Sequence, residues 1–225
     1  MVASFAVAGR FESGLVVDVA HAVIAHDPDR SFAGWGLVYC YGNRLEAIRS
    51  PAGPAALRFD QLSDIRTDMV MMSLTDSPPQ RGRPTGQPFL RREPGQSWAF
   101  GFDGAVSRPQ ELRIENRIPD GPSAEERLFL HLLAAFDDNE PVESVLRAQD
   151  GLPAEDRLDF LLMNVDMLFA NCRGPAAGTP TLWFGRGRLV RLVGPFPLLS
   201  VKGIDWEPVA PGTVLAIARF RRASS

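Results

Sequence analysis

One apolar segment near the middle of the chain constrains the fold more than any other. Residues 98–104 read Trp-Ala-Phe-Gly-Phe-Asp-Gly, a run typical of a buried strand followed by residues that favour tight turns. Gln87-Pro88-Phe89 stands about ten residues before this segment. We therefore expect a strand that ends in a turn at Asp103 and Gly104, with positive φ at Gly101 and Gly104 as the simplest reason for the two glycines.

The periodicity of apolar residues predicts strands at both ends of the chain and helices between them. The expected elements are a strand at 4–8, a helix at 15–24, a hairpin over 37–48 that turns at Gly42-Asn43, a helix at 54–65, a strand at 68–74, helices at 123–138 and 141–148, and short strands from 158 to 220. Ser123 begins a Ser-x-x-Glu capping box. The stretch 75–96, rich in Pro, Gly and Arg, is predicted to be the longest loop. This order indicates an α+β fold, and 225 residues suit a single domain over 1–225.

Composition excludes several classes of protein. A formal net charge of −3 and a pI near 5.7 argue against a general nucleic-acid binder. The two cysteines, Cys40 and Cys172, lie in apolar strand-like runs without metal-ligand spacing, which indicates a reduced, cytoplasmic protein. No window reaches the roughly 18 continuous apolar residues of a membrane span. The three histidines are scattered, so we expect no metal and no cofactor.

Several short segments, taken in order, resemble the class II glutamine amidotransferases, a family of N-terminal-nucleophile hydrolases. The matching segments are Ala33-Gly34-Trp35-Gly36, Gln87-Pro88-Phe89 with the strand up to Gly104, the hairpin-like stretch 159–170, and the closing segment 206–218. Each match is short, but together they cover almost the whole chain. The resemblance implies a four-layer αββα sandwich, in which two antiparallel sheets lie between helical layers.

The resemblance also implies where catalytic groups should lie, and this chain departs from the pattern there. The family's oxyanion-stabilising Asn is replaced by Asp103, before Gly104, and an ionised carboxylate accepts hydrogen bonds but donates none. The family's nucleophile is an N-terminal cysteine whose own α-amine is the base. This chain begins Met1-Val2-Ala3-Ser4, so Ser4 is the nearest counterpart and its amine is blocked.

The residues that would hold glutamine are replaced as well. The resemblance places Ser73-Leu74-Thr75 where the family has a carboxylate-binding Arg, and Ala124 where it has an ammonium-binding Asp. Ala33 and Gln87 replace a further Asp and a His. We therefore predict a protein that has lost glutaminase activity and acts as a binding or regulatory subunit, with a protein partner or a second copy of itself. The alternative is an amidase or γ-glutamyl hydrolase that uses Ser4 after cleavage behind Ala3.

Four residues are candidates for binding an unidentified small molecule. Arg81 and Arg83 belong to an Arg-rich loop that could grip a carboxylate or a phosphate, although charged loops are usually only solvated. Trp35, between two glycines, could line a pocket or pack beneath the first sheet. Asp103 is the fourth candidate, because it replaces a residue of the family's site.

Overall fold

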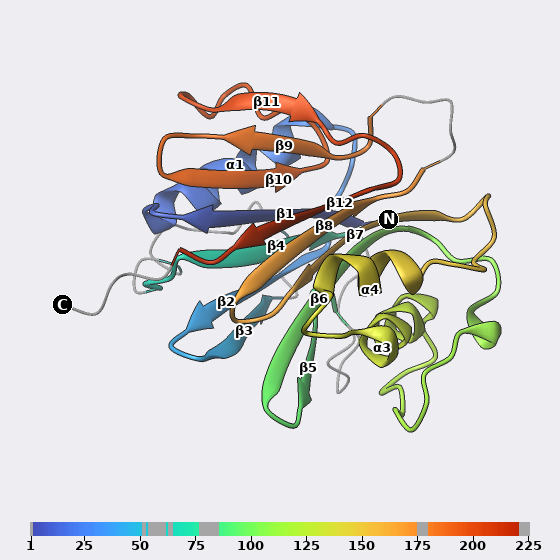
Figure 1. The fold of residues 1–225 in the computed structure, drawn as a ribbon. Coiled ribbons are helices and arrows are strands. Elements are labelled where there is room, and N and C mark those ends of the chain that lie inside the picture. Colours follow the sequence, from blue (N-terminus) through green and yellow to red (C-terminus); the bar gives the residue numbers. More distant parts are fainter. Residues whose placement is uncertain are drawn as a thin grey trace.

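Two antiparallel sheets lie face to face between helical layers. The computed structural model describes residues 2–50, 53, 62, 65–76, 86–174 and 180–220. Helix α1 (Ser13–His26) covers the outer face of a seven-stranded sheet. Helices α3 (Ala124–Ala135) and α4 (Pro141–Arg147) cover the outer face of a five-stranded sheet (Figure 1). The four-layer αββα sandwich is confirmed.

The strand order brings the beginning of the chain to the middle of the larger sheet. Its strands are ordered β11-β9-β10-β1-β4-β2-β3, with bounds Asp205–Pro208, Trp183–Arg186, Val190–Gly194, Val2–Gly9, Met69–Thr75, Gly34–Tyr41 and Arg44–Ser50. The smaller sheet is ordered β12-β8-β7-β6-β5, with bounds Thr213–Ala218, Met167–Cys172, Arg157–Met163, Gln96–Ala105 and Phe89–Glu93. A short 3₁₀ helix, η2, spans Pro109–Glu111.

Alternation along β1 explains how one strand serves two cores. Phe5 and Val7 pack with α1, whereas Ala6 and Ala8 pack between the two sheets, since successive side chains point to opposite faces. The third core lies beneath α3 and α4. There the ring of Phe100 stacks on that of Phe129, with centroids 5.2 Å apart.

Most of the predicted elements are present. The early strand, α1, the hairpin of β2 and β3, α3, α4 and the late strands are confirmed, and Gly42 takes φ +61° in the hairpin turn. Ser123 caps α3 by accepting a hydrogen bond from the Glu126 N–H at 3.0 Å. The Glu126 carboxylate bonds instead to the Asp120 and Gly121 N–H groups, so it holds the preceding loop. Apart from Leu62 and Ile65, the predicted helix at 54–65 lies outside the described residues.

Two predictions about the middle of the chain are wrong. The stretch 75–96 contains strand β5, which pairs with β6 through a turn at Gly95, φ +84°. The turn predicted at Asp103 and Gly104 does not form, because β6 continues to Ala105 along β7. Neither Gly101 nor Gly104 has a positive φ. The glycine at 104 instead permits close approach, since a Cβ there would lie 2.0 Å from the Arg157 carbonyl oxygen.

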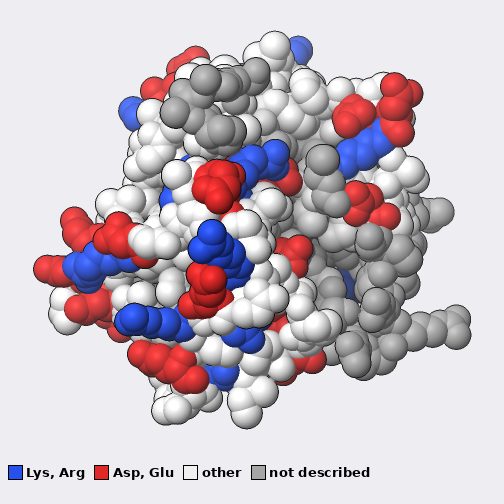
Figure 2. Space-filling view, turned by 90° about the vertical axis from the view of Figure 1, so that its right-hand side faces the viewer, with Lys and Arg blue, Asp and Glu red and all other residues white. Residues whose placement is uncertain are grey.

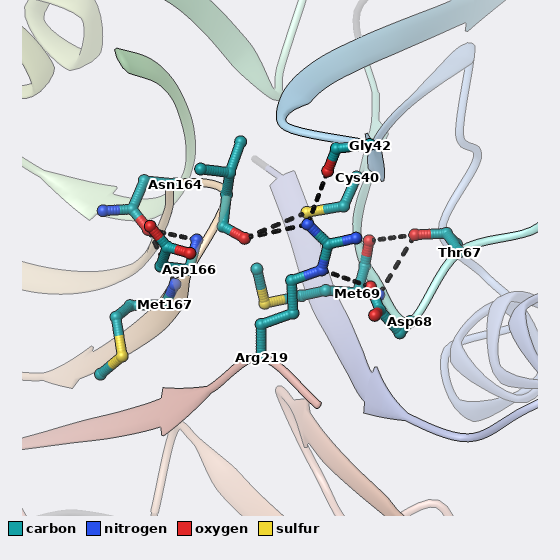
Figure 3. Close-up of polar contacts among 10 residues, drawn as sticks. Cys40, Gly42, Thr67, Asp68, Met69, Asn164, Asp166, Met167 and Arg219 are labelled. Carbon is teal, nitrogen blue, oxygen red and sulfur yellow. Dashed lines mark hydrogen bonds and ion pairs between the residues drawn. The ribbon is translucent and has the colours of Figure 1, made fainter. Parts of the chain in front are cut away.

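A single arginine links the two sheets at one end of the sandwich (Figure 3). Arg219 follows β12, and its Nε lies 2.6 Å from Asp68 Oδ1 beside β4. Its Nη1 donates to the carbonyl oxygens of Gly42 and Val165, at 2.8 and 3.2 Å. One side chain thus ties the β2–β3 turn, the start of β4 and the β7–β8 turn together.

The surface carries charges of both signs. On the face drawn in Figure 2, basic side chains (Lys and Arg) are interspersed with Asp and Glu across the described area, and no broad region of one sign is visible there. This agrees with the net charge of −3 and gives phosphate groups no extended basic surface on that face. Among the described residues, no helix is long and apolar enough to cross a membrane.

Candidate functional site

The candidate site lies between the sheets, at the end of the sandwich opposite Arg219. Ser4 of β1 pairs in register with Ser73 of β4, and their hydroxyl oxygens are 2.7 Å apart. Both side chains are buried, with 7% and 0% of their surface exposed. Each hydroxyl therefore has the other as its partner, in a place that water does not reach freely.

The facing strand supplies the second half of the site. Gly101 of β6 comes so close that a Cβ there would lie 2.9 Å from the Ser4 hydroxyl oxygen and 3.1 Å from that of Ser73. Asp103, two residues on, lines the same small cavity as Ser4. That cavity measures about 10 Å³, which is room for about one water molecule. Its other described lining residues are Asp159, Phe160, Leu161, Thr181, Leu182 and Pro195.

Two carboxylates share one guanidinium at this cavity. Arg157 Nη2 lies 2.8 Å from Asp103 Oδ1, and Arg157 Nε lies 3.2 Å from Asp159 Oδ2. Asp103 and Asp159 are register partners across β6 and β7. Burial raises the pKa of Asp103, and the charge of Arg157 opposes that shift. Burial likewise raises the pKa of Asp159, whereas a hydrogen bond with the Thr181 hydroxyl and the charge of Arg157 act to lower it.

The chemistry available to Ser4 is limited by its surroundings. Its neighbours Ala3 and Val2 pair with Leu74 and Thr75 of β4, so Ser4 sits inside a strand and its nitrogen belongs to a peptide bond. The only hydrogen bond of the Ser4 side chain within the described part of the chain goes to Ser73. His131, on α3, bonds to two backbone carbonyls elsewhere. Within the described residues, Ser4 therefore has no general base hydrogen-bonded to it.

Gln87 borders the site from the loop before β5. Its side-chain oxygen accepts a hydrogen bond from the Phe102 N–H at 2.6 Å. Pairing of β5 with β6 begins at Phe89 and Phe100, so this bond continues the contact along β6 by two residues. Its backbone fills the space beside Gly36, where a Cβ would lie 2.4 Å from the Gln87 carbonyl oxygen. Gln87 thus has a structural role in continuing the β6 edge.

The other candidate residues lie apart from this cavity. Trp35 is 5% exposed and packs in the core between α1 and the larger sheet, on the opposite face from Ser4. Asp103 is therefore the only one of the four ligand-binding candidates that the described structure brings to Ser4. Arg81 and Arg83 lie outside the described residues. No cluster of metal-ligating side chains occurs within the described ranges.

Sequence reasoning missed Asp159 and Arg49. Asp159 was interpreted only as part of a hairpin, although Arg157 and Asp159 alternate with apolar residues and share one face of β7. Arg49 is on the inward face of β3 with Leu45 and Ala47. Its Nε and Nη2 donate to the carbonyl oxygens of Gly86 and Pro88, at 3.2 and 2.8 Å. Burial lowers the pKa of Arg49.

Solved structures with the same arrangement of sheets and helices include a glutamine phosphoribosylpyrophosphate amidotransferase from B. subtilis and a glutamine aminotransferase class-II domain protein from Silicibacter pomeroyi. This is the fold of the class II glutamine amidotransferases. The Bacillus enzyme superposes with a TM-score of 0.75 at 19% identity over 96% of this chain. The chain spans 47% of that enzyme's length, about half.

Shorter proteins match over nearly their whole length. The Silicibacter protein has a TM-score of 0.61 at 16% identity, covering 96% of this chain and 94% of its own. A predicted glutamine amidotransferase from Pseudomonas aeruginosa has a TM-score of 0.61 at 15% identity, covering 96% and 93%. No protein-family model matches the sequence, and no curated protein matches it either. At these identities the amidotransferase likeness concerns the fold.

Proposed function

We propose that this chain is a class II glutamine amidotransferase-like domain that does not hydrolyse glutamine and acts as a binding or regulatory subunit. The observation that carries the proposal is the ion pair of Asp103 with Arg157. In the family that this chain resembles, the residue matched to Asp103 has a side-chain amide, which donates a hydrogen bond to the developing oxyanion. A carboxylate there repels that charge, and loss of one such donor costs about 10²–10³ in rate.

The surroundings of Ser4 support the same proposal. An N-terminal nucleophile needs a free α-amine beside its side chain, whereas Ser4 is held in β1 with residues before it paired to β4. Its hydroxyl faces Ser73, which is neutral and weakly basic. The cavity of about 10 Å³ has room for about one water and none for a glutamine side chain.

Loss of the substrate-binding charges points the same way. The segment expected to supply an Arg for the substrate carboxylate ends β4 as Ser73-Leu74-Thr75, and Ser73 is fully buried against Ser4. Ala124, which replaces the ammonium-binding Asp, is the first residue of α3. Without these charges, glutamine loses both of its orienting contacts.

A partner is part of the proposal. The similar Bacillus chain is about twice as long, so the shared fold there occupies about half of a larger protein. We propose that this single domain, in the cytoplasm, works with a separate protein or with a second copy of itself. Size-exclusion chromatography with light scattering, combined with purification from the source cells, tests this; a clean monomer without an associated protein argues against it.

Glutaminase assay of the purified protein tests the main proposal. We expect no ammonia release from glutamine above the buffer rate, for the wild type and for Asp103→Ala alike. Steady release that Asp103→Ala abolishes would contradict the proposal, because Asp103 would then be catalytic. Asp159→Ala serves as a matched control for loss of an Arg157 partner, because the same guanidinium contacts both carboxylates.

The position of Ser4 supports a second candidate function, that of an amidase or γ-glutamyl hydrolase. Ser4 lines the small cavity with Asp103, so cleavage behind Ala3 would place a free amine and a hydroxyl together, as an amidase or γ-glutamyl hydrolase requires. Intact-mass measurement decides between the two. Loss of residues 1–3 supports the hydrolase, and an intact Val2-Ala3 segment supports the non-catalytic domain.

A further inference from the structure

A second, larger cavity lies where the edges of the two sheets meet α3. It measures about 110 Å³, and its described lining comes from β3, β5, α3 and the loop before α3; β3 and β5 are the last strands of the two sheet orders. Its described lining residues are Arg49, Phe89, Leu90, Arg91, Asp120, Glu126, Phe129 and Leu130. Because one water needs about 10–15 Å³ by this measure, the cavity has room for roughly seven to eleven water-sized groups, which is the size of a small organic molecule.

This cavity is separate from the one at Ser4. Ser4, Ser73, Gly36 and Arg49 form one row across four neighbouring strands. Three strand spacings put the Arg49 Cα roughly 14 Å from that of Ser4. The Gln87-Pro88 segment fills the space above Gly36 between them, within 2.4 to 2.9 Å of where a Cβ would stand. The described linings of the two cavities share no residue.

Arg49 brings a positive charge to this cavity without a matching negative partner. Among the described residues no carboxylate lies within ion-pair distance of its guanidinium, which bonds to two neutral backbone carbonyls. Those bonds use Nε and one N–H of Nη2, so the edge formed by Nη1 and the other Nη2 hydrogen has no partner in the described part of the chain. That planar edge matches the two oxygens of a carboxylate.

Apart from the exposed carboxylate of Asp120, the rest of the lining is apolar or already engaged. Phe89, Phe129 and Leu130 supply apolar walls. The Glu126 oxygens accept hydrogen bonds from the Asp120 and Gly121 backbones, at 2.7 and 2.9 Å. Arg91 pairs with Glu93 at 3.5 Å. Of the two guanidinium groups in the described lining, only that of Arg49 pairs with no carboxylate, and it lies beside carboxylates that disfavour a strongly charged anion.

We propose that this cavity binds a small organic monocarboxylate with an apolar body. The carboxylate would accept two hydrogen bonds from the free edge of Arg49, and the apolar body would lie against Phe89, Phe129 and Leu130. A monoanion is favoured over phosphate because Asp120 and Glu126 repel a second negative charge. The site goes beyond the proposed non-catalytic role and does not depend on it, since Ser4 and Asp103 take no part.

Isothermal titration calorimetry with benzoate on the full chain tests the proposal. We expect saturable binding to the wild type, weakened on the order of tenfold or more in Arg49→Gln, because a charge-assisted hydrogen-bonding pair is lost. Arg44→Gln is the matched control. Arg44 lies on the same strand, is exposed and pairs with Glu46, so benzoate affinity should not change.

Arg49 also holds two loop carbonyls, so Arg49→Gln is checked for folding by circular dichroism. Asp120→Asn provides an independent readout, because it alters an exposed side chain and removes a repelling charge. We expect this variant to bind benzoate two- to threefold more tightly, as a weak surface electrostatic effect of about 0.5 kcal/mol converts to that change.

Three results would overturn the proposal. They are no benzoate binding to the wild type, equal binding by folded Arg49→Gln, and Arg49-dependent binding of inorganic phosphate tighter than that of benzoate. The glutaminase assay is independent of these outcomes, so failure here leaves the proposed function standing.

Discussion

The hydrogen bond between Ser4 and Ser73 offers a direct test of whether Ser4 is a structural residue. Ser4→Ala removes one hydroxyl and leaves the other, 2.7 Å away, without its partner in a buried position. Ser73→Ala does the reverse. The double variant removes both polar groups, so no unpaired hydroxyl is left between the sheets. The free energies of unfolding of these variants should therefore not be additive.

The expected size follows from the burial of the pair. An unpaired buried hydroxyl costs about 1–3 kcal/mol, so each single variant should lose about that much stability. Replacing both partners by apolar groups is nearly neutral, and we expect the double variant to lose less than about 1 kcal/mol. The coupling energy is then at least about 1 kcal/mol, in the range measured for residues in direct contact.

Urea unfolding of the wild type, both single variants and the double variant measures this coupling. Ser97→Ala is the control: Ser97 is a half-buried serine of β6 with no side-chain hydrogen bond inside the described ranges, and its replacement should change stability by less than about 0.5 kcal/mol. Additivity of Ser4→Ala and Ser73→Ala within 0.5 kcal/mol or so would refute the reasoning. So would loss of a measurable hydrolase activity in Ser4→Ala alone.

Three further outcomes are expected. Burial raises the pKa of Asp159, so between its usual 3.8 and the raised value the native state holds more protons than the unfolded state, and the stability of the wild type falls as pH rises. Asp159→Asn should therefore gain stability relative to the wild type above about pH 4. A difference in urea midpoints that does not depend on pH would contradict this. Gly104→Ala should cost about 1–3 kcal/mol or more, since its Cβ meets the Arg157 backbone, whereas Gly174→Ala meets nothing within 4 Å and should be nearly neutral in the same measurement. Burial raises the pKa of Cys40 to about 12, so its thiol should resist Ellman's reagent at pH 8 until the protein is unfolded, and fast labelling of the native protein would show this interpretation to be wrong.

Local sequence signals predicted correctly those elements whose formation depends mainly on residues close by in the chain. The Ser123 cap and the apolar spacing after it predicted α3, and Gly42-Asn43 predicted the hairpin, because both depend on neighbours in the chain. The end of β6 was predicted wrongly for the opposite reason. Asp103-Gly104 favours a turn locally, but pairing with β7, more than fifty residues later, keeps the strand extended.

The candidate site was predictable only in part. Position 103 was found because its residue type breaks a family pattern, and the structure brings it to the same cavity as Ser4. Its partner Arg157 carries no such signal, since an arginine at the start of a strand is ordinary in sequence. Arg49 is similar: only the meeting of two sheet edges with α3 turns it into the charged wall of a cavity.

The placement of polar groups explains how this fold is compatible with the loss of activity that we propose. The middle of the inter-sheet layer is apolar, built from residues such as Met71, Leu161 and Ala170. The polar side chains gather at its two ends, around Arg157 and around Arg219. Because most burial comes from the apolar layers, substitutions at one end change the chemistry without removing the core. The acidic side chain at position 103 is accordingly compensated by one cation on the neighbouring strand, Arg157.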